Sequence, residues 1–408
     1  MNSRVSAKVV SGNSKTRSRS RKKPWQPYIE AAAGFRNHWY FAFFSHELPQ
    51  SGVSEGLGEN IVKVKAAKLL GERILFRRSG ANIYAIEDRC IHKGVPFSVR
   101  PECFTDETIT CWYHGFTYRM SDGLLRTIIS DPASPLIGKV KLKTYPVVEV
   151  KGLVFVFIGD IDPPRLSHDL PPGLLDDNFV VYPEGWSKTL NANWRLGAEN
   201  GFDPAHSYLH RNSALVRAFH LPTVMGDTGI SESHGMQTFD GPGPKGILLI
   251  RGAAEPIWEA DIEPDVTLTA RFIPGQPGVV EGLVPQVSIW MPGVLKVEPF
   301  PAPDLFHFEW YVPVDENHHN YVITWGRYVE SDDERDRFFD EVTTLWKPLV
   351  PTTFNNEDQL AREAMQNFYA NEDGWYRERL FGPDIVVTRW RELASRSNRG
   401  IQPIPPPV

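Results

Sequence analysis

Two short motifs decide the fold of this chain, Cys90-Ile91-His92 and Cys111-Trp112-Tyr113-His114. Each motif offers one thiolate and one imidazole, and each is followed closely by a glycine. In a [2Fe–2S] cluster, thiolates can hold one iron while two neutral imidazoles hold the other and raise its potential. The paired motifs therefore predict a mixed-ligand [2Fe–2S] site formed by Cys90, His92, Cys111 and His114.

A zinc site is the alternative reading of the same four residues, because tetrahedral zinc accepts two Cys and two His. Zinc folds usually place Cys beside Cys and His beside His, whereas here the two types are interleaved, which favours the cluster. The third cysteine, Cys103, lies between the motifs and has no second spare cysteine to pair with. We expect it to be an ordinary packed thiol.

A second group of metal-binding residue types follows in the segment Asn200-Gly201-Phe202-Asp203-Pro204-Ala205-His206-Ser207-Tyr208-Leu209-His210. Residues four apart share one face of an α-helix, so His206 and His210 can point at one ion. Asp203 lies one turn before His206 and can accept an imidazole N–H. The pattern predicts the core of a 2-His-1-carboxylate Fe(II) site, which leaves coordination positions open for O₂.

The third ligand of such a site must come from elsewhere in the chain. The segment after Phe354 contains Glu357 and Asp358 in a predicted first helical turn. Spacing alone does not choose between these two carboxylates. A [2Fe–2S] electron carrier followed by an O₂-binding metal predicts an oxygenase.

Composition excludes several other classes of protein. The chain has 408 residues, of which 41% are hydrophobic and 23% charged, with three cysteines. These values suit a globular protein of about two domains. So few clustered cysteines exclude a disulfide framework and fit a reducing compartment, so we expect a cytoplasmic protein. No run reaches the roughly 18 apolar residues of a membrane span, so no membrane partner is expected.

The N-terminus differs in charge from the rest of the chain. Eight of the 44 Lys and Arg residues, and no acid, lie in residues 1–23, although the formal net charge is -6. The segment lacks aromatic residues and an apolar face, so we predict a disordered basic tail over residues 1–24 rather than a nucleic-acid or lipid contact. No apolar stretch follows the charges, so it is not a secretory signal.

Hydrophobic patterning predicts an α+β fold in two parts. Short β-type runs at Ile61–Val64, Arg73–Phe76, Ile83–Ile86 and Leu153–Ile158 indicate a small antiparallel β domain over residues 25–162. Asp162-Pro163-Pro164 breaks the pattern and sets the boundary. Residues 163–408 are predicted to form the metal-binding catalytic domain.

The second domain mixes strands and helices. Three β-type runs, Val287–Val297, Leu305–Val312 and Tyr321–Tyr328, predict an antiparallel sheet. Ser331 and Glu334 form a capping box before an amphipathic helix, which we expect Pro348 and Pro351 to end, with another helix near Asn356. Residues 194–212 are expected to be partly helical.

One apparent nucleotide motif is rejected. Gly241-Pro242-Gly243-Pro244-Lys245-Gly246 matches GxGxxG as a string, but it precedes a β-type run and its prolines forbid the required turn. The sequence contains no other nucleotide or flavin signature. Electrons are therefore expected to come from a separate protein.

The ordered motifs resemble the catalytic α subunits of Rieske non-haem iron ring-hydroxylating oxygenases. The pattern is C-x-H and C-x2-H, then E-N-x-x-D-x-x-H-x3-H, then E-D-x4-E, and the resemblance covers roughly residues 25–400. Within that family the chain is most similar to the branch that dihydroxylates carbazole-like fused heteroaromatics at the angular carbon. Lys93 and Phe116 depart from the common Arg and Trp of the family.

The resemblance implies a role for each candidate residue. Cys90, His92, Cys111 and His114 would ligate the cluster; His206, His210 and Asp358 would ligate the mononuclear iron. The E-D-x4-E frame is what selects Asp358 over Glu357. Asp203 would link His206 to His114 of a neighbouring subunit, the backbone of Gly201 would meet the substrate, and Phe354 would line its pocket.

The resemblance also implies architecture and partners. A Rieske domain of antiparallel sheets would precede a helix-grip catalytic domain, in a homotrimer without a β subunit. A ferredoxin, reduced by a separate NAD(P)H reductase, would supply electrons for O₂ activation. The alternative within the same build is a monooxygenase or demethylase that acts on a related heteroaromatic such as a quinolone. A plain Rieske electron carrier would need only the first 160 residues.

Overall fold

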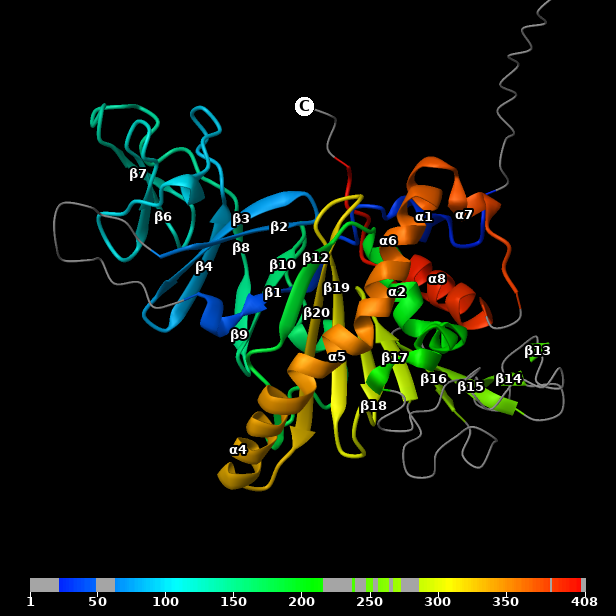
Figure 1. Cartoon of the computed structure of the whole chain (residues 1–408). Helices are drawn as coiled ribbons and strands as arrows, with labels where there is room; N and C mark the ends of the chain where they lie inside the picture. The colour runs from blue at the N-terminus through cyan, green and yellow to red at the C-terminus, as the bar shows by residue number, and fades with distance from the viewer. Residues whose placement is uncertain are drawn as a thin grey trace, which may run out of the picture.

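Figure 1 shows the computed structural model of the chain. The structure describes residues 22–48, 63–215, 237–238, 247–251, 256–263, 267–272, 286–381 and 384–404. Nearly all of the predicted basic tail, the start of the run at Ile61 and the GxGxxG-like segment lie outside the described residues. No helix in the described ranges is long and apolar enough to cross a membrane.

The N-terminal part consists of three small antiparallel sheets, as the short β-type runs predicted. One sheet joins β1 (His38–Phe44), β10 (Leu153–Ile158) and β9 (Val147–Val150). A second joins β2 (Lys65–Leu69), β3 (Glu72–Ser79), β4 (Asn82–Glu87) and β8 (Thr144–Tyr145). The third, which carries one of the two Cys–His motifs, joins β5 (Thr108–Thr110), β6 (Phe116–Arg119) and β7 (Leu125–Ile128).

The C-terminal part is built on one large antiparallel sheet, which in the described residues has ten strands. The strand order runs β11-β20-β19-β18-β17-β16-β15-β14-β13, with β12 also paired to β20. The bounds are β11 Phe179–Val181, β12 Trp186–Leu190, β13 Gln237–Thr238, β14 Ile247–Arg251, β15 Pro256–Glu263, β16 Thr267–Phe272, β17 Gln286–Trp290, β18 Val294–Glu298, β19 Phe306–Pro313 and β20 His319–Tyr328.

The predicted single run Val287–Val297 is in fact the hairpin β17–β18. Pro292 and Gly293 lie in its turn, where Gly293 has a positive φ of 148°. A proline cannot donate to a sheet ladder, and this backbone conformation favours glycine, so the chain reverses instead of continuing.

Helices are gathered on the sheet, where Figure 1 shows α2 (Trp194–Phe202), α6 (Asn355–Asn371) and α8 (Ile385–Ser397) close together. The remaining helical segments are α1 Gln26–Glu30, α4 Asp332–Glu341, η4 Pro204–Asn212, the π-helical η6 Val342–Trp346, α5 Lys347–Thr353 and α7 Gly374–Arg377, with short 3-10 turns at η1 Ser45–Glu47, η2 Phe97–Val99 and η3 Leu166–Asp169. Sheets with segregated helices confirm the predicted α+β class.

The predicted helix start at Ser331 is confirmed, because its hydroxyl accepts the Glu334 N–H at 3.3 Å. The prediction that Pro348 and Pro351 end this helical region was wrong. Pro348 lies in the first turn of α5, where a missing N–H costs little, and Pro351 is accommodated within the same helix. A π-helical turn precedes α5 and carries the chain on toward α6.

The N-terminal helix α1 packs on the C-terminal part of the molecule rather than on the small β sheets. Tyr28 is fully buried in a core shared with Trp194 and Trp390, and its ring meets Trp194 edge-on at 5.7 Å. Another core joins the β1–β10 sheet to β19, where Phe41 lies 5.6 Å from Trp310. The two parts of the chain are therefore joined by continuous apolar packing.

Candidate metal centres

Two loops of matching backbone geometry carry the Cys–His motifs. In each loop the cysteine carbonyl accepts an N–H from the glycine four residues on, at 2.9 Å for both Gly94 and Gly115. These glycines have φ values of 70° and 69°, a conformation that other residues rarely adopt. A Cβ at Gly115 would also lie 2.6 Å from that of Ile129. The glycines after each motif therefore allow the tight turns that present the ligands.

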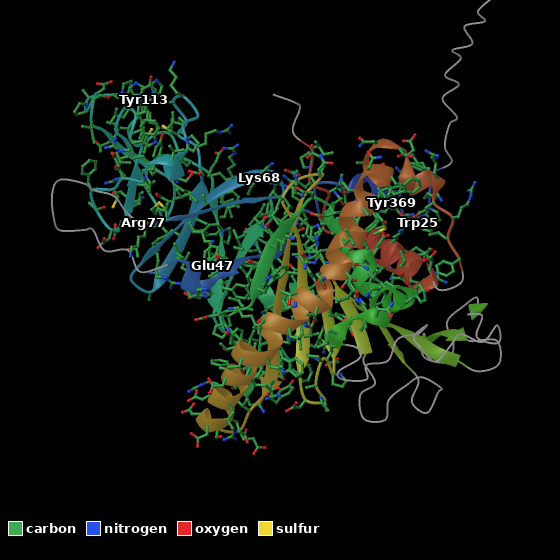
Figure 2. The ribbon with its side chains drawn as sticks, in the orientation of Figure 1. Trp25, Glu47, Lys68, Arg77, Tyr113 and Tyr369 are labelled. Carbon is green, nitrogen blue, oxygen red and sulfur yellow. The ribbon has the colours of Figure 1, made fainter. Side chains whose placement is uncertain are left out.

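The two loops bury their thiols and expose their imidazoles. Cys90 and Cys111 are 1% and 2% exposed, whereas His92 is exposed and His114 half-buried. The Nδ1 atoms of the two imidazoles lie 3.2 Å apart. Figure 2 shows the neighbouring Tyr113 at the far end of the small β domain, well away from the helices of the large sheet. The histidine side of this site therefore faces outward at one end of the molecule.

The electrostatics of the two thiols suit a cationic group between them. Contact with the Cys111 thiol is the largest influence on Cys90, and it lowers the Cys90 pKa to about 6. The same contact, together with burial, raises the pKa of Cys111. Both thiolates can be present together only if positive charge compensates their repulsion, as a metal cluster does.

The spacing of the four ligand atoms fits a two-iron cluster better than a single zinc ion. The two thiols contact each other and the two imidazoles contact each other, so the four ligand atoms form two like pairs. A tetrahedral zinc ion would draw all four to within a few ångströms. In a [2Fe–2S] cluster the thiolates and imidazoles bind different irons, so the two pairs remain separate.

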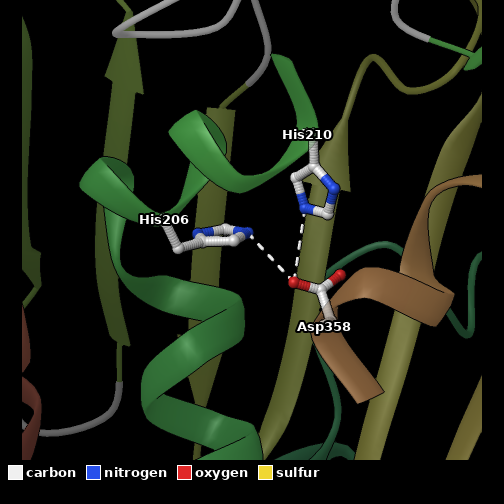
Figure 3. Close-up of side chains that lie close together, drawn as sticks. All are labelled: His206, His210 and Asp358. Carbon is white, nitrogen blue, oxygen red and sulfur yellow. Dashed lines mark ion pairs between the residues drawn. The ribbon is translucent and has the colours of Figure 1, made fainter. Parts of the chain in front are cut away.

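The second candidate site joins η4 to α6, and Figure 3 shows its three side chains converging. Asp358 Oδ1 lies 3.6 Å from His206 Nε2 and 3.3 Å from His210 Nε2. Among the described residues this is the one cluster of three or more His, Cys, Asp or Glu side chains that could hold a metal ion. His210 Nε2 is buried and, apart from its contact with Asp358, has no hydrogen-bond partner, as expected of an atom that binds a metal.

The helix that carries both histidines is a 3-10 helix, not the α-helix that their spacing predicted. Pro204 follows α2 directly and Asp203 caps the new helix, so the α-helix stops at Phe202. Residues four apart are not aligned in a 3-10 helix, which has three residues per turn. The two imidazole planes accordingly stand at 86°, with ring centres 5.3 Å apart.

Glu357 and Asp358, between which the spacing did not decide, both contact the histidines of this site. Asp358 is 2% exposed and faces the two histidines, whereas Glu357 Oε2 lies 2.9 Å from the Nδ1 atom of His210. An N–H on Nδ1 donates to Glu357 and leaves Nε2 free for a metal. Burial opposes ionisation of Asp358, but the imidazoles and Arg362 outweigh it and hold its pKa well below the usual value.

Asp203 meets His206 in a different way from the one predicted. Its carboxylate accepts the N–H of Ala205 at 2.8 Å and so caps η4, while its backbone carbonyl faces His206 Nδ1. Burial raises the pKa of this carboxyl to about 6. The predicted link to His114 of a neighbouring subunit remains a prediction, and the second carboxylate oxygen is the atom that would make it.

The two residues predicted to touch substrate lie beside this site. The Phe354 ring stacks on His210, with ring centres 3.8 Å apart and planes at 17°. A Cβ at Gly201 would lie 1.9 Å from the hydroxyl of Tyr311, so only glycine fits there. A cavity of about 510 Å³ is lined by His206 together with Asp203, Tyr208, Tyr369 and Arg379, among others; Figure 2 labels Tyr369.

Two asparagines that hold Asp358 in place were assigned no role from the sequence. Asn200 Nδ2 donates to its Oδ1 at 3.3 Å, and Asn355 Nδ2 donates to its Oδ2 at 3.1 Å. Asn200 is part of the E-N-x-x-D-x-x-H-x3-H pattern but was given no role, and Asn355 has no spacing that marks it as functional. Their position directly beside Glu199 and Phe354 in the two motif segments was the only available signal.

Comparison with known proteins agrees with this geometry. Residues 38–146 match the Rieske [2Fe-2S] domain, and residues 157–402 match the homotrimeric ring hydroxylase family. The chain belongs to this family of Rieske ring hydroxylases. Its cofactors are accordingly a [2Fe–2S] cluster and a mononuclear iron, with O₂ as co-substrate.

Similar relatives cover almost the whole chain. The chain is 45% identical to the carbazole 1,9a-dioxygenase terminal oxygenase component CarAa of Metapseudomonas resinovorans, over 94% of this chain and 96% of that protein. The corresponding protein of Sphingomonas sp. is 44% identical over 94% and 97%. A solved reduced complex between oxygenase and ferredoxin in carbazole 1,9a-dioxygenase superimposes with a TM-score of 0.77 at 41% identity, covering 93% of this chain and 94% of that chain.

Proposed function

We propose that this chain is the terminal oxygenase component of an aromatic-ring dioxygenase that adds both atoms of O₂ to a carbazole-like fused heteroaromatic at the angular position. The observation that carries the proposal is the buried convergence of His206, His210 and Asp358, in a chain that is 45% identical to a carbazole dioxygenase component. Carbazole is the substrate named for both of the similar proteins described above.

The two sets of ligands divide between the two domains, which we place at residues 25–162 and 163–408. Cys90 and Cys111 hold one iron of the cluster, and His92 and His114 hold the other. His206, His210 and Asp358 hold the mononuclear iron, which supplies reductive activation of O₂ when bound. Glu357 fixes the His210 tautomer, and Phe354 gives the substrate side of the site an apolar wall.

Electrons reach the mononuclear iron from another chain in this proposal. Within one chain, the loops beside β6 and β7 lie at one end of the molecule, well away from α2 and α6, which flank the mononuclear site (Figures 1 and 2). A homotrimer arranged head to tail brings the His92–His114 face of one subunit to the cavity beside Asp203 and His206 of the next. Asp203 then links the two sites through Oδ2, since Oδ1 accepts the Ala205 N–H.

The electron donor is a ferredoxin, reduced in turn by a separate NAD(P)H reductase. The chain resembles oxygenases solved in complex with ferredoxin, and its cluster imidazoles are accessible at the molecular surface. Three free cysteines, two of them in the cluster loops, suit a reducing cytoplasm.

Product analysis tests the proposal. The purified oxygenase, reconstituted with a ferredoxin and reductase, is given carbazole, dibenzofuran or naphthalene under ¹⁸O₂. We expect angular products with two labelled oxygen atoms from carbazole and dibenzofuran. Incorporation of a single oxygen atom would instead identify a monooxygenase or demethylase of the same build, and lateral diols alone would rule out the carbazole-type assignment.

A further inference from the structure

Asp358 and four other buried polar residues form a closed ring of contacts. Beyond the two amide contacts already described, Asn200 Oδ1 accepts the Nε–H of Arg362 at 2.5 Å. On the other side, Asn355 Nδ2 donates to Glu309 Oε1 at 3.1 Å. The Arg362 guanidinium lies 3.7 Å from Glu309 Oε2, which closes the ring. None of the five is more than 8% exposed.

The Asn355 amide has only one orientation that satisfies this ring. Its NH₂ group has two hydrogens, and they bridge two carboxylates, those of Asp358 and Glu309. If the amide rotated by half a turn, its carbonyl oxygen would face both carboxylates and repel them. Glu309 therefore determines which end of Asn355 meets Asp358.

Glu309 is itself held in place by its neighbours on the sheet. His307 Nε2 lies 2.9 Å from Glu309 Oε1, and the Tyr311 hydroxyl donates to Oε2. The three residues alternate along β19, so they share the face of the sheet that meets α6. Burial raises the pKa of Glu309, but the hydrogen bond and charge of His307 and the charge of Arg362 outweigh this and lower it, so the group is ionised.

We propose that Glu309 is a positioning residue for the metal carboxylate. It holds the Asn355 amide with its hydrogens toward Asp358 Oδ2, and so keeps Asp358 Oδ1 aimed between His206 and His210. This inference rests on the proposed function, because it takes Asp358 as the ligand of the mononuclear iron. A merely structural Glu309 would stabilise the core through Arg362 and leave metal binding unchanged.

Metal titration separates these two roles. Oxygenase with an intact cluster, freed of its mononuclear metal by a mild chelator, is titrated with Co(II), whose visible absorption reports ligand geometry. For Glu309→Gln we expect a Co(II) Kd weaker by about 10–100-fold and shifted absorption bands, with the cluster spectrum unchanged. Wild-type affinity and bands in Glu309→Gln would overturn the inference.

Asp169→Asn is the matched control. Asp169 is also a fully buried carboxylate, paired with His38 at 2.9 Å and with Arg399, but it has no contact to the ring that includes Asp358. The variant should lose stability and keep wild-type Co(II) affinity. An equal loss of affinity in Asp169→Asn would mean that any buried charge has this effect, and the positioning role would be overturned.

Glu309→Asp provides a second variant if the glutamine variant does not fold. It keeps the charge that balances Arg362 but is one methylene shorter, so it no longer reaches Asn355. We expect a smaller loss of Co(II) affinity in the same direction, and wild-type binding would again overturn the inference. Co(II) binding to the wild type should be abolished by His206→Ala. If it is not, or if the wild type binds no Co(II), the proposed function itself fails and not only the role of Glu309.

Discussion

The four proposed cluster ligands all lie in residues 90–114, whereas the proposed mononuclear site joins η4 to the start of α6, more than a hundred residues further along the chain. Backbone hydrogen bonds and two glycines shape the first site, and its imidazoles lie at the surface. Buried side chains shape the second, where each oxygen of Asp358 meets an asparagine. A site shaped by its own loops can be changed without disturbing the rest of the fold. A site shaped by buried side chains from distant segments also depends on the residues that position those side chains.

The largest expected effect is the loss of a mononuclear ligand. In His206→Ala or Asp358→Ala, one of the three proposed metal ligands is lost. The rate of oxygenation should therefore fall by more than the roughly 100-fold that is typical when a residue hydrogen-bonded to a ligand is removed. The cluster spectrum should remain, since its ligands lie in the other domain. Iron content, absorption and product formation measured together check this, and loss of the cluster signal in either variant would contradict the division into two independent sites.

The reverse experiment alters the cluster. Cys111→Ser should bleach or shift the cluster absorption and stop electron entry, because a thiolate ligand is lost. Mononuclear metal binding should persist, since its proposed ligands lie on η4 and α6, outside these loops. A native spectrum in this variant would remove Cys111 from the ligand set.

Asp203→Asn tests the junction between the two sites. Asparagine caps a helix as well as aspartate, so the unfolding free energy should change by less than about 0.5 kcal/mol. Both metals should stay bound, but turnover should slow about 10–100-fold if the second carboxylate oxygen links the sites. Single-turnover product formation with a chemically pre-reduced cluster is the measurement, and a near-normal rate would leave Asp203 as a helix cap only.

The smallest effect concerns a surface contact that joins the two domains. Asp315 pairs with Lys68 of β2 at 2.7 Å and with His318 at 2.7 Å (Figure 2 labels Lys68). Burial opposes ionisation of Asp315, but these hydrogen bonds outweigh it and lower its pKa to about 2. Because the Lys68 side chain is 42% exposed, Asp315→Asn should cost no more than about 1 kcal/mol at neutral pH.

The pH dependence of this contact has a definite sign. A lowered folded-state pKa stabilises the protein above the unfolded value, near 3.9, and that stabilisation is lost as the pH falls toward 2. The difference in unfolding free energy between wild type and Asp315→Asn should therefore shrink through this range. A difference that is constant from pH 6 to pH 2 would show that the charge of Asp315 contributes nothing.

Features that depend on residues close in sequence were predictable, whereas contacts between residues far apart in the chain were not. The α+β class and the helix start at Ser331 follow from residues close in sequence, and the structure agrees with both. The paired Cys–His motifs predicted a Rieske domain, which the family comparison matches over residues 38–146. The 3-10 helix at Pro204–Asn212 was missed because the four-residue spacing of the two histidines was read as that of an α-helix. The ring through Glu309 and Arg362 was missed because strand β19 and helix α6 meet only in the folded chain.

The separation of the two sites within one chain has a consequence for mixed populations of subunits. Neither a Cys111→Ser chain nor a His206→Ala chain should turn over alone, yet a ring containing both can place an intact cluster next to an intact iron. Random mixing of equal amounts before assembly would make about one interface in four competent. The unit that performs catalysis would then be the contact between two chains, and activity could be recovered by combining two dead proteins.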